Sequence, residues 1–209
     1  MARDEYPTVE APRSGKRVRY LDTADRTDGE AARFEMWLAP PPESAGPMRH
    51  VHPEQDEDLE VVAGTLGVWH EGTTRTLGPG ESVTIPAGDA HRFWNAGDDE
   101  LHLIGEVRPA LDTEAFMYVT YGLAGDHLAT ASGMPLNPLL LAPVLAEYDD
   151  LLYLAVVPVW LQKLAIRLVA PAGRALGYGA SYPEYVPAAR REALAGVRDR
   201  DDDADPGAR

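Results

Sequence analysis

The feature that most constrains the fold is a series of short, evenly spaced segments between residues 48 and 107, separated by glycine-rich turns. Several segments alternate apolar and polar residues, which is the period of a half-buried β-strand. The turns, such as Gly78-Pro79-Gly80, contain residues that favour chain reversal. Strands are expected at 58–63, 66–70, 73–77, 82–85, 91–94 and 101–107. Many short strands at this spacing predict an antiparallel sandwich or barrel.

The β region extends toward the N-terminus. Residues 16–21 and 33–39 also alternate, and in the second segment Phe34, Met36 and Leu38 share one face. We therefore predict a β-barrel over residues 16–110. Residues 1–15 are polar and contain prolines, so we expect a flexible N-terminal arm there.

The sequence pattern changes near Pro109 and favours helices from there on. Helices are expected at 112–123, where Asp112 is a suitable N-cap, at 138–148, which opens with proline, and at 158–176. Residues 111–190 thus form a predicted helical C-terminal extension. Residues 191–209, which close with RDRDDDADPGAR, read as an acidic disordered tail.

Four residues inside the β region are good metal ligands: His50, His52, Glu57 and His91. His50 and His52 are two apart, so a strand would place both on one face. Glu57 lies beside them if the strand that it opens pairs back on the strand of the two histidines, and His91 arrives from another strand. Three imidazoles and one carboxylate leave two positions open in an octahedral site. This set suits Fe, Mn, Ni, Cu, Co or Zn and disfavours Mg or Ca, which prefer oxygen ligands.

Composition excludes several classes of protein. The chain contains no cysteine, which rules out disulfides, Fe–S clusters and thiolate zinc sites. Its net charge of −15 argues against nucleic-acid binding. The first residues contain no apolar signal segment, so we expect a cytoplasmic protein. Only two of the 19 basic residues are lysines, which fits either a halophilic source or a GC-rich genome.

Side chains that face the interior of the predicted barrel belong to its core, to a ligand pocket or to both. Apolar side chains there would suit an aromatic or aliphatic small molecule better than a sugar phosphate. His102 shares a strand face with Ile104 and Glu106. If that face points inward, His102 lies near the metal; an outward orientation, which we favour, makes it a surface residue. The candidate pocket residues are Phe34, Met36, Met48, Phe93 and His102.

The two histidine clusters resemble the two sequence motifs of the cupin superfamily. The first motif is matched by His50, His52, Glu57 and Gly64, and the second by Gly80, Pro86, Gly88, His91 and Asn95. One glycine of the first motif is absent, since Gly46 stands four residues before His50 rather than six. The resemblance covers residues 46–107. It implies a double-sheet jelly-roll barrel of six to eight strands, followed here by the helical extension, and a homodimer.

The resemblance and the ligand set together favour a metal-dependent enzyme acting on a small organic molecule. An oxidoreductase of the dioxygenase-like kind is the leading hypothesis, with one Fe, Mn, Ni, Cu or Zn ion as cofactor. An isomerase or cyclase that uses the metal as a Lewis acid is an alternative on the same site. A non-catalytic cupin that binds a small molecule is another, because fold does not determine function.

The helix predicted at 158–176 differs in charge from the rest of the chain. No acidic residue occurs between Asp150 and Glu184, whereas Lys163, Arg167 and Arg174 do. The same helix has an apolar stripe that includes Trp160. We interpret it as a helix that packs on the barrel or on a dimer partner, with peripheral membrane contact as the alternative.

Overall fold

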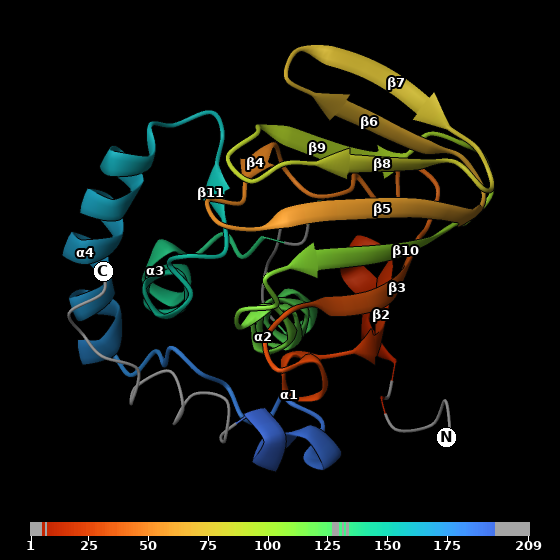
Figure 1. Cartoon of the computed structure of the whole chain (residues 1–209). Helices are drawn as coiled ribbons and strands as arrows, with labels where there is room; N and C mark the ends of the chain where they lie inside the picture. The colour runs from red at the N-terminus through yellow and green to blue at the C-terminus, as the bar shows by residue number, and fades with distance from the viewer. Residues whose placement is uncertain (1–5, 7, 127–129, 131, 133, 195–209) are drawn as a thin grey trace.

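The computed structural model describes residues 6, 8–126, 130, 132 and 134–194, and these form two antiparallel sheets with helices at one end (Figure 1). The first sheet has the order β1-β2-β3-β10-β5-β8, and the second has the order β11-β4-β9-β6-β7. The first sheet comprises β1 (Val9–Ala11), β2 (Lys16–Asp22), β3 (Ala32–Leu38), β10 (Leu101–Arg108), β5 (Asp56–Ala63) and β8 (Ser82–Ile85). The second comprises β11 (Tyr153–Leu154), β4 (His50–Val51), β9 (His91–Asn95), β6 (Leu66–His70) and β7 (Thr73–Leu77).

The core lies between the two sheets, and the alternation in the sequence places it there. In β3, Phe34, Met36 and Leu38 are buried, while the residues between them are only partly buried. β10 follows the same alternation beside β3. Full burial of a side chain of this size contributes about 1.5–3 kcal/mol. The predicted fold class, a mainly β jelly-roll barrel with a helical extension, is confirmed.

Three short elements differ from the sequence prediction. The flexible arm predicted for residues 1–15 is wrong from residue 8 onward, because β1 pairs with β2 and Ala11 is buried. A short helix, α1 (Ala24–Thr27), lies between β2 and β3, where no helix was predicted. β11 adds an edge strand to the second sheet by pairing with β4. Segments of two to four residues carry too little periodicity to be recognised, and pairing with a distant neighbour decides their conformation.

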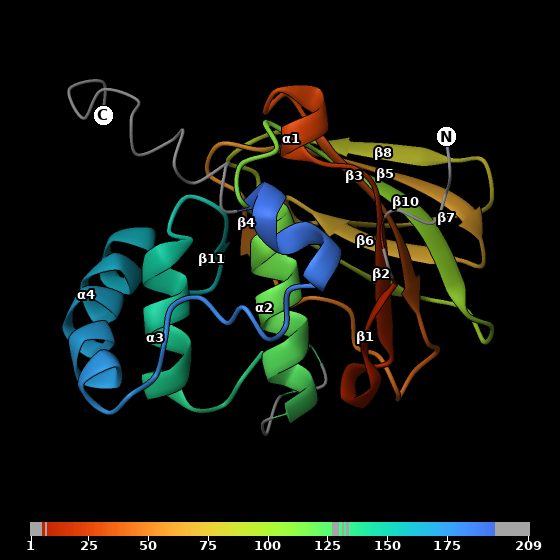
Figure 2. The same ribbon diagram turned by 90° about the horizontal axis from the view of Figure 1, so that it is seen from below.

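The C-terminal part forms helices close to the predicted ranges: α2 (Thr113–Asp126), α3 (Pro138–Glu147) and α4 (Val159–Ala175). Figure 2 shows α2 against the barrel, with α3 beside it and α4 farthest out. Gly173 allows α4 to approach α3 closely, because a Cβ atom there would lie 2.1 Å from the Leu139 carbonyl oxygen. None of the helices in the described residues is long and apolar enough to cross a membrane.

A buried arginine forms ion pairs that hold the C-terminal end of the described residues against α1 and α2. Arg190, in the 3-10 helix η2 (Ala188–Arg190), is 4 % exposed. Its Nε lies 2.8 Å from Glu114 on α2, and its Nη2 lies 2.6 Å from Asp25 on α1. Leu194 is also buried, so the tail prediction is wrong for residues 191–194. The rest of the predicted tail, residues 195–209, lies outside the described residues.

Candidate metal centre

Four side chains meet between the two sheets. His50 on β4 and His91 on β9 are direct register partners in the second sheet, and His52 follows two residues after His50. Glu57 reaches them from β5 in the first sheet. Their ligand atoms all lie within 4.8 Å of one another, and His50, Glu57 and His91 are buried. The structure therefore brings together the four residues that the sequence singled out as metal ligands.

The strand pairing that brings Glu57 to the histidines differs from the prediction. We expected the strand of Glu57 to pair with the strand of the two histidines. Instead β5 pairs with β10 and β8, while β4 pairs with β9 and β11. Residues 53–55 carry the chain from one sheet to the other, so Glu57 faces the imidazoles across the barrel. The centre consequently joins both sheets rather than one hairpin.

Each imidazole is oriented by a backbone carbonyl. His50 Nδ1 donates a hydrogen bond to Met48 O at 2.7 Å, His52 Nδ1 to Leu151 O at 2.5 Å, and His91 Nδ1 to Asp89 O at 3.0 Å. A carbonyl only accepts, so each Nδ1 carries a proton and the neutral ring has its lone pair on Nε2. His50 Nε2 and His52 Nε2 lie only 3.2 Å apart. Two lone pairs this close need a positive centre between them, as in histidine sites that hold a metal.

The remaining two ligand atoms support the same interpretation. His91 Nε2 and Glu57 Oε2 lie 2.9 Å apart, yet among the described residues neither atom has a hydrogen bond of suitable geometry. Buried polar atoms are almost always satisfied in native proteins. Three nitrogen donors and one carboxylate oxygen suit a transition metal. The four residues therefore fit the ion that the sequence predicted, and they would hold it.

The protonation states favour metal binding at neutral pH. Burial lowers the pKa of His50 well below its usual range, and burial also lowers the pKa of His52. Burial alone would raise the pKa of Glu57, but His91 and the other two histidines outweigh it and lower that pKa to about 2. Burial alone would lower the pKa of His91, but the opposite effect of Glu57 is larger, so the pKa of His91 is raised above its usual value. A metal ion would displace a proton from His91, so binding is coupled to proton release.

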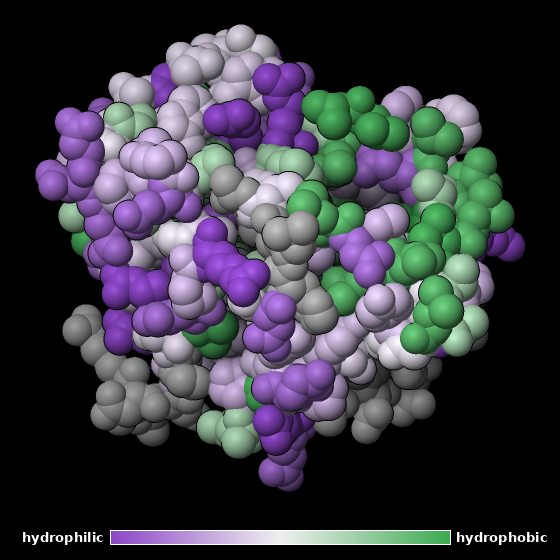
Figure 3. Space-filling view, turned by 180° about the vertical axis from the view of Figure 1, so that it is seen from behind, coloured by the Kyte–Doolittle hydropathy of each residue, from purple (hydrophilic) through white to green (hydrophobic). Residues whose placement is uncertain are grey.

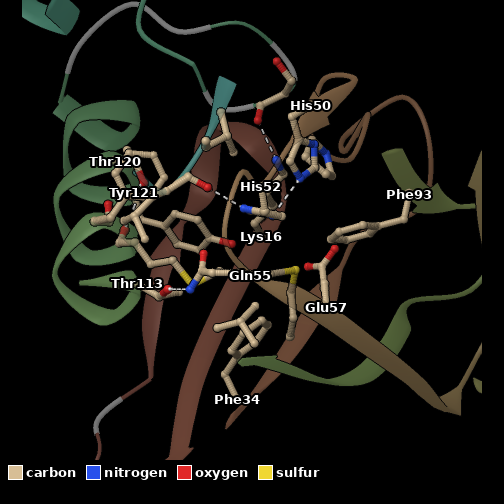
Figure 4. A pocket seen from close by; sticks show the side chains of 18 of the residues that line it. Lys16, Phe34, His50, His52, Gln55, Glu57, Phe93, Thr113, Thr120 and Tyr121 are labelled. Carbon is tan, nitrogen blue, oxygen red and sulfur yellow. Dashed lines mark hydrogen bonds between the residues drawn. The ribbon is translucent and has the colours of Figure 1, made fainter. Parts of the chain in front are cut away.

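A cavity of about 140 Å³ adjoins the centre, and side chains from both sheets and α2 surround it (Figure 4). Three of the metal ligands line it: His50, His52 and Glu57. Most of the lining is apolar or aromatic. The predicted pocket residues Phe34, Met36 and Phe93 lie on its wall. The helical extension contributes Phe116, Met117, Thr120, Tyr121, Met134, Leu151 and Leu152.

Two predicted pocket residues do not line the cavity. His102 lies on the outer face of the first sheet, where its ring stacks on Trp37 at 4.7 Å and its Nε2 lies 3.3 Å from Glu35. The inward orientation is therefore wrong and the outward one is confirmed, since β10 buries the alternate residues Leu101 and Leu103. Met48 serves the site through its carbonyl, which accepts the His50 hydrogen bond, and its side chain is absent from the cavity wall.

Sequence reasoning missed the residues that the helices and β2 add to the cavity. Lys16 is the clearest case, because its side chain lines the cavity and is only 6 % exposed. The sequence pattern did indicate that Lys16 points inward, because in the alternating strand it shares a face with Val18 and Tyr20, which are both buried. The wall formed by α2 had no comparable signal, since nothing in the sequence tells which helix covers the barrel mouth.

Comparison with known proteins agrees with this geometry. Residues 36–105 match the sequence model of the cupin domain family. A curated relative, "Polyketide synthase CurC" from Streptomyces cyaneus, is 35 % identical over 74 residues, which are 32 % of this chain and 48 % of that protein. The chain thus spans about half the length of this relative.

Two solved structures resemble the barrel. One is a sugar phosphate isomerase of the cupin superfamily from Silicibacter pomeroyi, with 22 % identity and a TM-score of 0.43, covering 52 % of this chain and 74 % of that one. The other is KdgF from Halomonas sp., with 21 % identity and a TM-score of 0.43, covering 52 % and 89 %. The matched residues 36–105 contain all four candidate ligands and both motifs. Residues 36–105, which form most of the β-barrel, therefore match the cupin domain family, and this match includes the whole candidate metal centre.

Proposed function

We propose that this protein is a metal-dependent cupin enzyme that carries out dioxygenase-like oxidoreductase chemistry on a small organic molecule. The observation that supports it is the convergence of three imidazole Nε2 atoms and one carboxylate beside an apolar cavity. A structural metal site has no need of a cavity, whereas a catalytic site keeps ligand positions open toward one.

The residues of the site have two separate roles: four would bind the metal, and the apolar ones surround the substrate. His50, His52, Glu57 and His91 would hold one Fe, Mn, Ni, Cu or Zn ion beside the cavity. When bound, a redox-active metal would relay electrons from the substrate to dioxygen, and a redox-inert one would polarise a carbonyl group. The apolar walls exclude water and position the substrate beside the ligands.

The cavity lining supports an aromatic or carbonyl-rich substrate. Phe34, Phe93, Phe116 and Tyr121 surround the space, which suits flat apolar molecules. The curated relative is described as a polyketide synthase, and polyketides carry carbonyl and phenol oxygens that coordinate divalent metals. We infer that this chain acts on a molecule with such an oxygen donor next to an apolar body.

An isomerase or cyclase that uses the metal as a Lewis acid is a second candidate, and Lys16 favours it. Burial lowers the pKa of Lys16 to about 8, which makes the neutral amine accessible as a proton acceptor near physiological pH. Isomerisation and cyclisation both need a proton acceptor near a polarised carbonyl. This reaction leaves dioxygen unused, which separates the two candidates.

Elemental analysis with oxygen uptake tests the proposal. Natively purified protein is expected to contain close to one Fe, Mn, Ni or Cu per chain. It should consume dioxygen when given phenols, catechols or 1,3-dicarbonyl compounds, because such donors bind beside the metal. Metal-stripped protein is the control and should consume none, with activity returning on reconstitution.

The other outcomes decide between the alternatives. Product formation without oxygen uptake, with zinc bound, would support the Lewis-acid reaction. A raised melting temperature with no product from any of these compounds would contradict the enzyme and support a ligand-binding cupin. A homodimer also stays a prediction, which sedimentation equilibrium would check.

A further inference from the structure

Lys16 is a cation buried in the cavity wall, with no counterion among the described residues. It lies on the inward face of β2, and Figure 4 draws it among the side chains around the cavity. Its Nζ donates a hydrogen bond to the Ser132 carbonyl oxygen at 2.6 Å. Within the described residues no carboxylate lies close enough to Lys16 to form an ion pair. An ammonium group has three donors, so two remain for a molecule in the cavity.

The charges around the cavity favour an anionic ligand. Among the described lining residues Glu57 is the one carboxylate, and it is directed at the three histidines. A divalent ion held there would more than neutralise it, and Lys16 would then add to the positive charge. The rest of the wall is largely apolar, so a cation in it is costly unless an anion joins it. A bound anion removes that cost.

We propose that Lys16 binds the anionic group of the substrate, so that the cavity selects small aromatic acids, or acidic phenols and enols, over neutral analogues. This inference rests on the proposed function only for taking the cavity as the substrate site. The volume of the cavity limits the ligand to about one aromatic ring. An engineered protein cavity of about 150 Å³ takes up benzene, and this cavity measures about 140 Å³. Single-ring probes are therefore appropriate.

Benzoate and benzamide form a matched pair of probes, equal in shape and different in charge. Both are titrated by calorimetry or ligand-detected NMR into metal-free and metal-loaded protein, with Lys16→Met and Lys16→Arg variants beside wild type. We expect wild type to bind benzoate at least about tenfold more tightly than benzamide, since charge-assisted hydrogen bonds are the stronger kind. Lys16→Met should abolish the preference, weakening benzoate much more than benzamide, and Lys16→Arg should retain part of it.

The pH dependence of the preference for benzoate is a further test, because a purely structural role of Lys16 would not make this preference depend on pH. Benzoate remains an anion throughout, whereas Lys16 loses its proton as the pH rises through about 8, so the preference should decline there. Equal binding of the two probes, no binding of benzoate, or a preference that survives Lys16→Met would each overturn the proposal. Because the metal-free arm needs no metal, a failure of the metal-centre proposal would leave the benzoate result standing.

A second, independent observation concerns the outward side of α4, which we call the α4 face. It consists of Trp160, Leu161, Leu164 and Leu168, which are between 41 % and 68 % exposed. Figure 3 shows apolar side chains gathered at the edge of the molecule where α4 lies. The opposite side of α4 packs on α3, where Ala170 and Gly173 are buried. The fold itself thus presents this apolar side outward.

Cations border the α4 face on one flank. Lys163 and Arg167 follow each other at one-turn spacing and are exposed, and Arg174 extends the row. The segment between Asp150 and Glu184 contains no acidic residue, in a chain of net charge −15. An apolar helix side with a tryptophan and a cationic flank fits the boundary of an anionic bilayer.

We infer that the α4 face binds the surface of anionic membranes, with α4 parallel to the bilayer. Co-sedimentation with vesicles tests it, using phosphatidylglycerol mixed with phosphatidylcholine against phosphatidylcholine alone. Wild type should bind the anionic vesicles and dissociate as salt rises, because the cations are screened. Leu164→Ser/Leu168→Ser and Lys163→Gln/Arg167→Gln should each lose binding, while Val62→Ser, an exposed apolar residue of the barrel, should keep it. Absence of binding, or self-association through this side that Leu164→Ser/Leu168→Ser removes, would overturn the inference.

Discussion

Replacing His50 and His91 together by alanine is expected to leave the purified protein without metal. The change removes the imidazoles of two of the four converging ligands and leaves the backbone pairing of β4 with β9 in place. The metal content measured by elemental analysis should fall from about one ion per chain to a trace. Added metal should raise the melting temperature of wild type but not of the variant. Binding at about 1,000 times the dissociation constant stabilises a protein by about 4 kcal/mol, and the variant should lack this gain.

His102→Ala is the matched control, because His102 is a histidine of the same barrel on the outer face of the first sheet. It should retain the metal and the metal-dependent rise in melting temperature. If the double variant still bound metal at one per chain with the same melting behaviour, the four residues would not be the ligands. Circular dichroism of each variant without metal would separate loss of metal from loss of fold.

Replacing Arg190 by methionine is expected to destabilise the protein by about 3–5 kcal/mol, the range for removing one partner of a buried ion pair. Glu114 is 3 % exposed and would remain in the interior without its cation. Asp25 would lose the same partner, and the pKa of Asp25 is lowered because Arg190 outweighs its partial burial. The free energy of unfolding, measured by urea denaturation, reports the change.

Arg191→Met is the control for this variant. Arg191 is the next residue, is exposed, and donates to the Val186 carbonyl oxygen. A surface substitution of this kind usually changes stability by no more than about 0.5 kcal/mol. Similar effects of the two substitutions would show that the buried ion pair contributes little and that the end of the chain is held by other contacts. Loss of stability in Arg190→Met alone would show that η2 is an integral part of the fold.

The strands and ligands were predictable because the relevant signals are local. Alternation with a period of two tells which residues of a strand share a face, as for Phe34, Met36 and Leu38. The spacing of His50 and His52, and the motif around His91, placed three imidazoles on strands and turns of known kind. Those signals also carried the resemblance to cupins, and hence the barrel and the candidate metal.

What only the tertiary structure decided is which distant segments meet. Alternation cannot show that β5 pairs with β10 and β8, so Glu57 reaches the histidines from the opposite sheet. It cannot show that α2 closes the cavity, or that Arg190 neutralises Glu114 across 76 residues. The physical reason is that strand pairing and the burial of a charge depend on long-range partners, whereas face and turn depend on neighbours in the chain. Lys16 lies at this boundary: its face was visible in the sequence, but the cavity that it lines exists only in the fold.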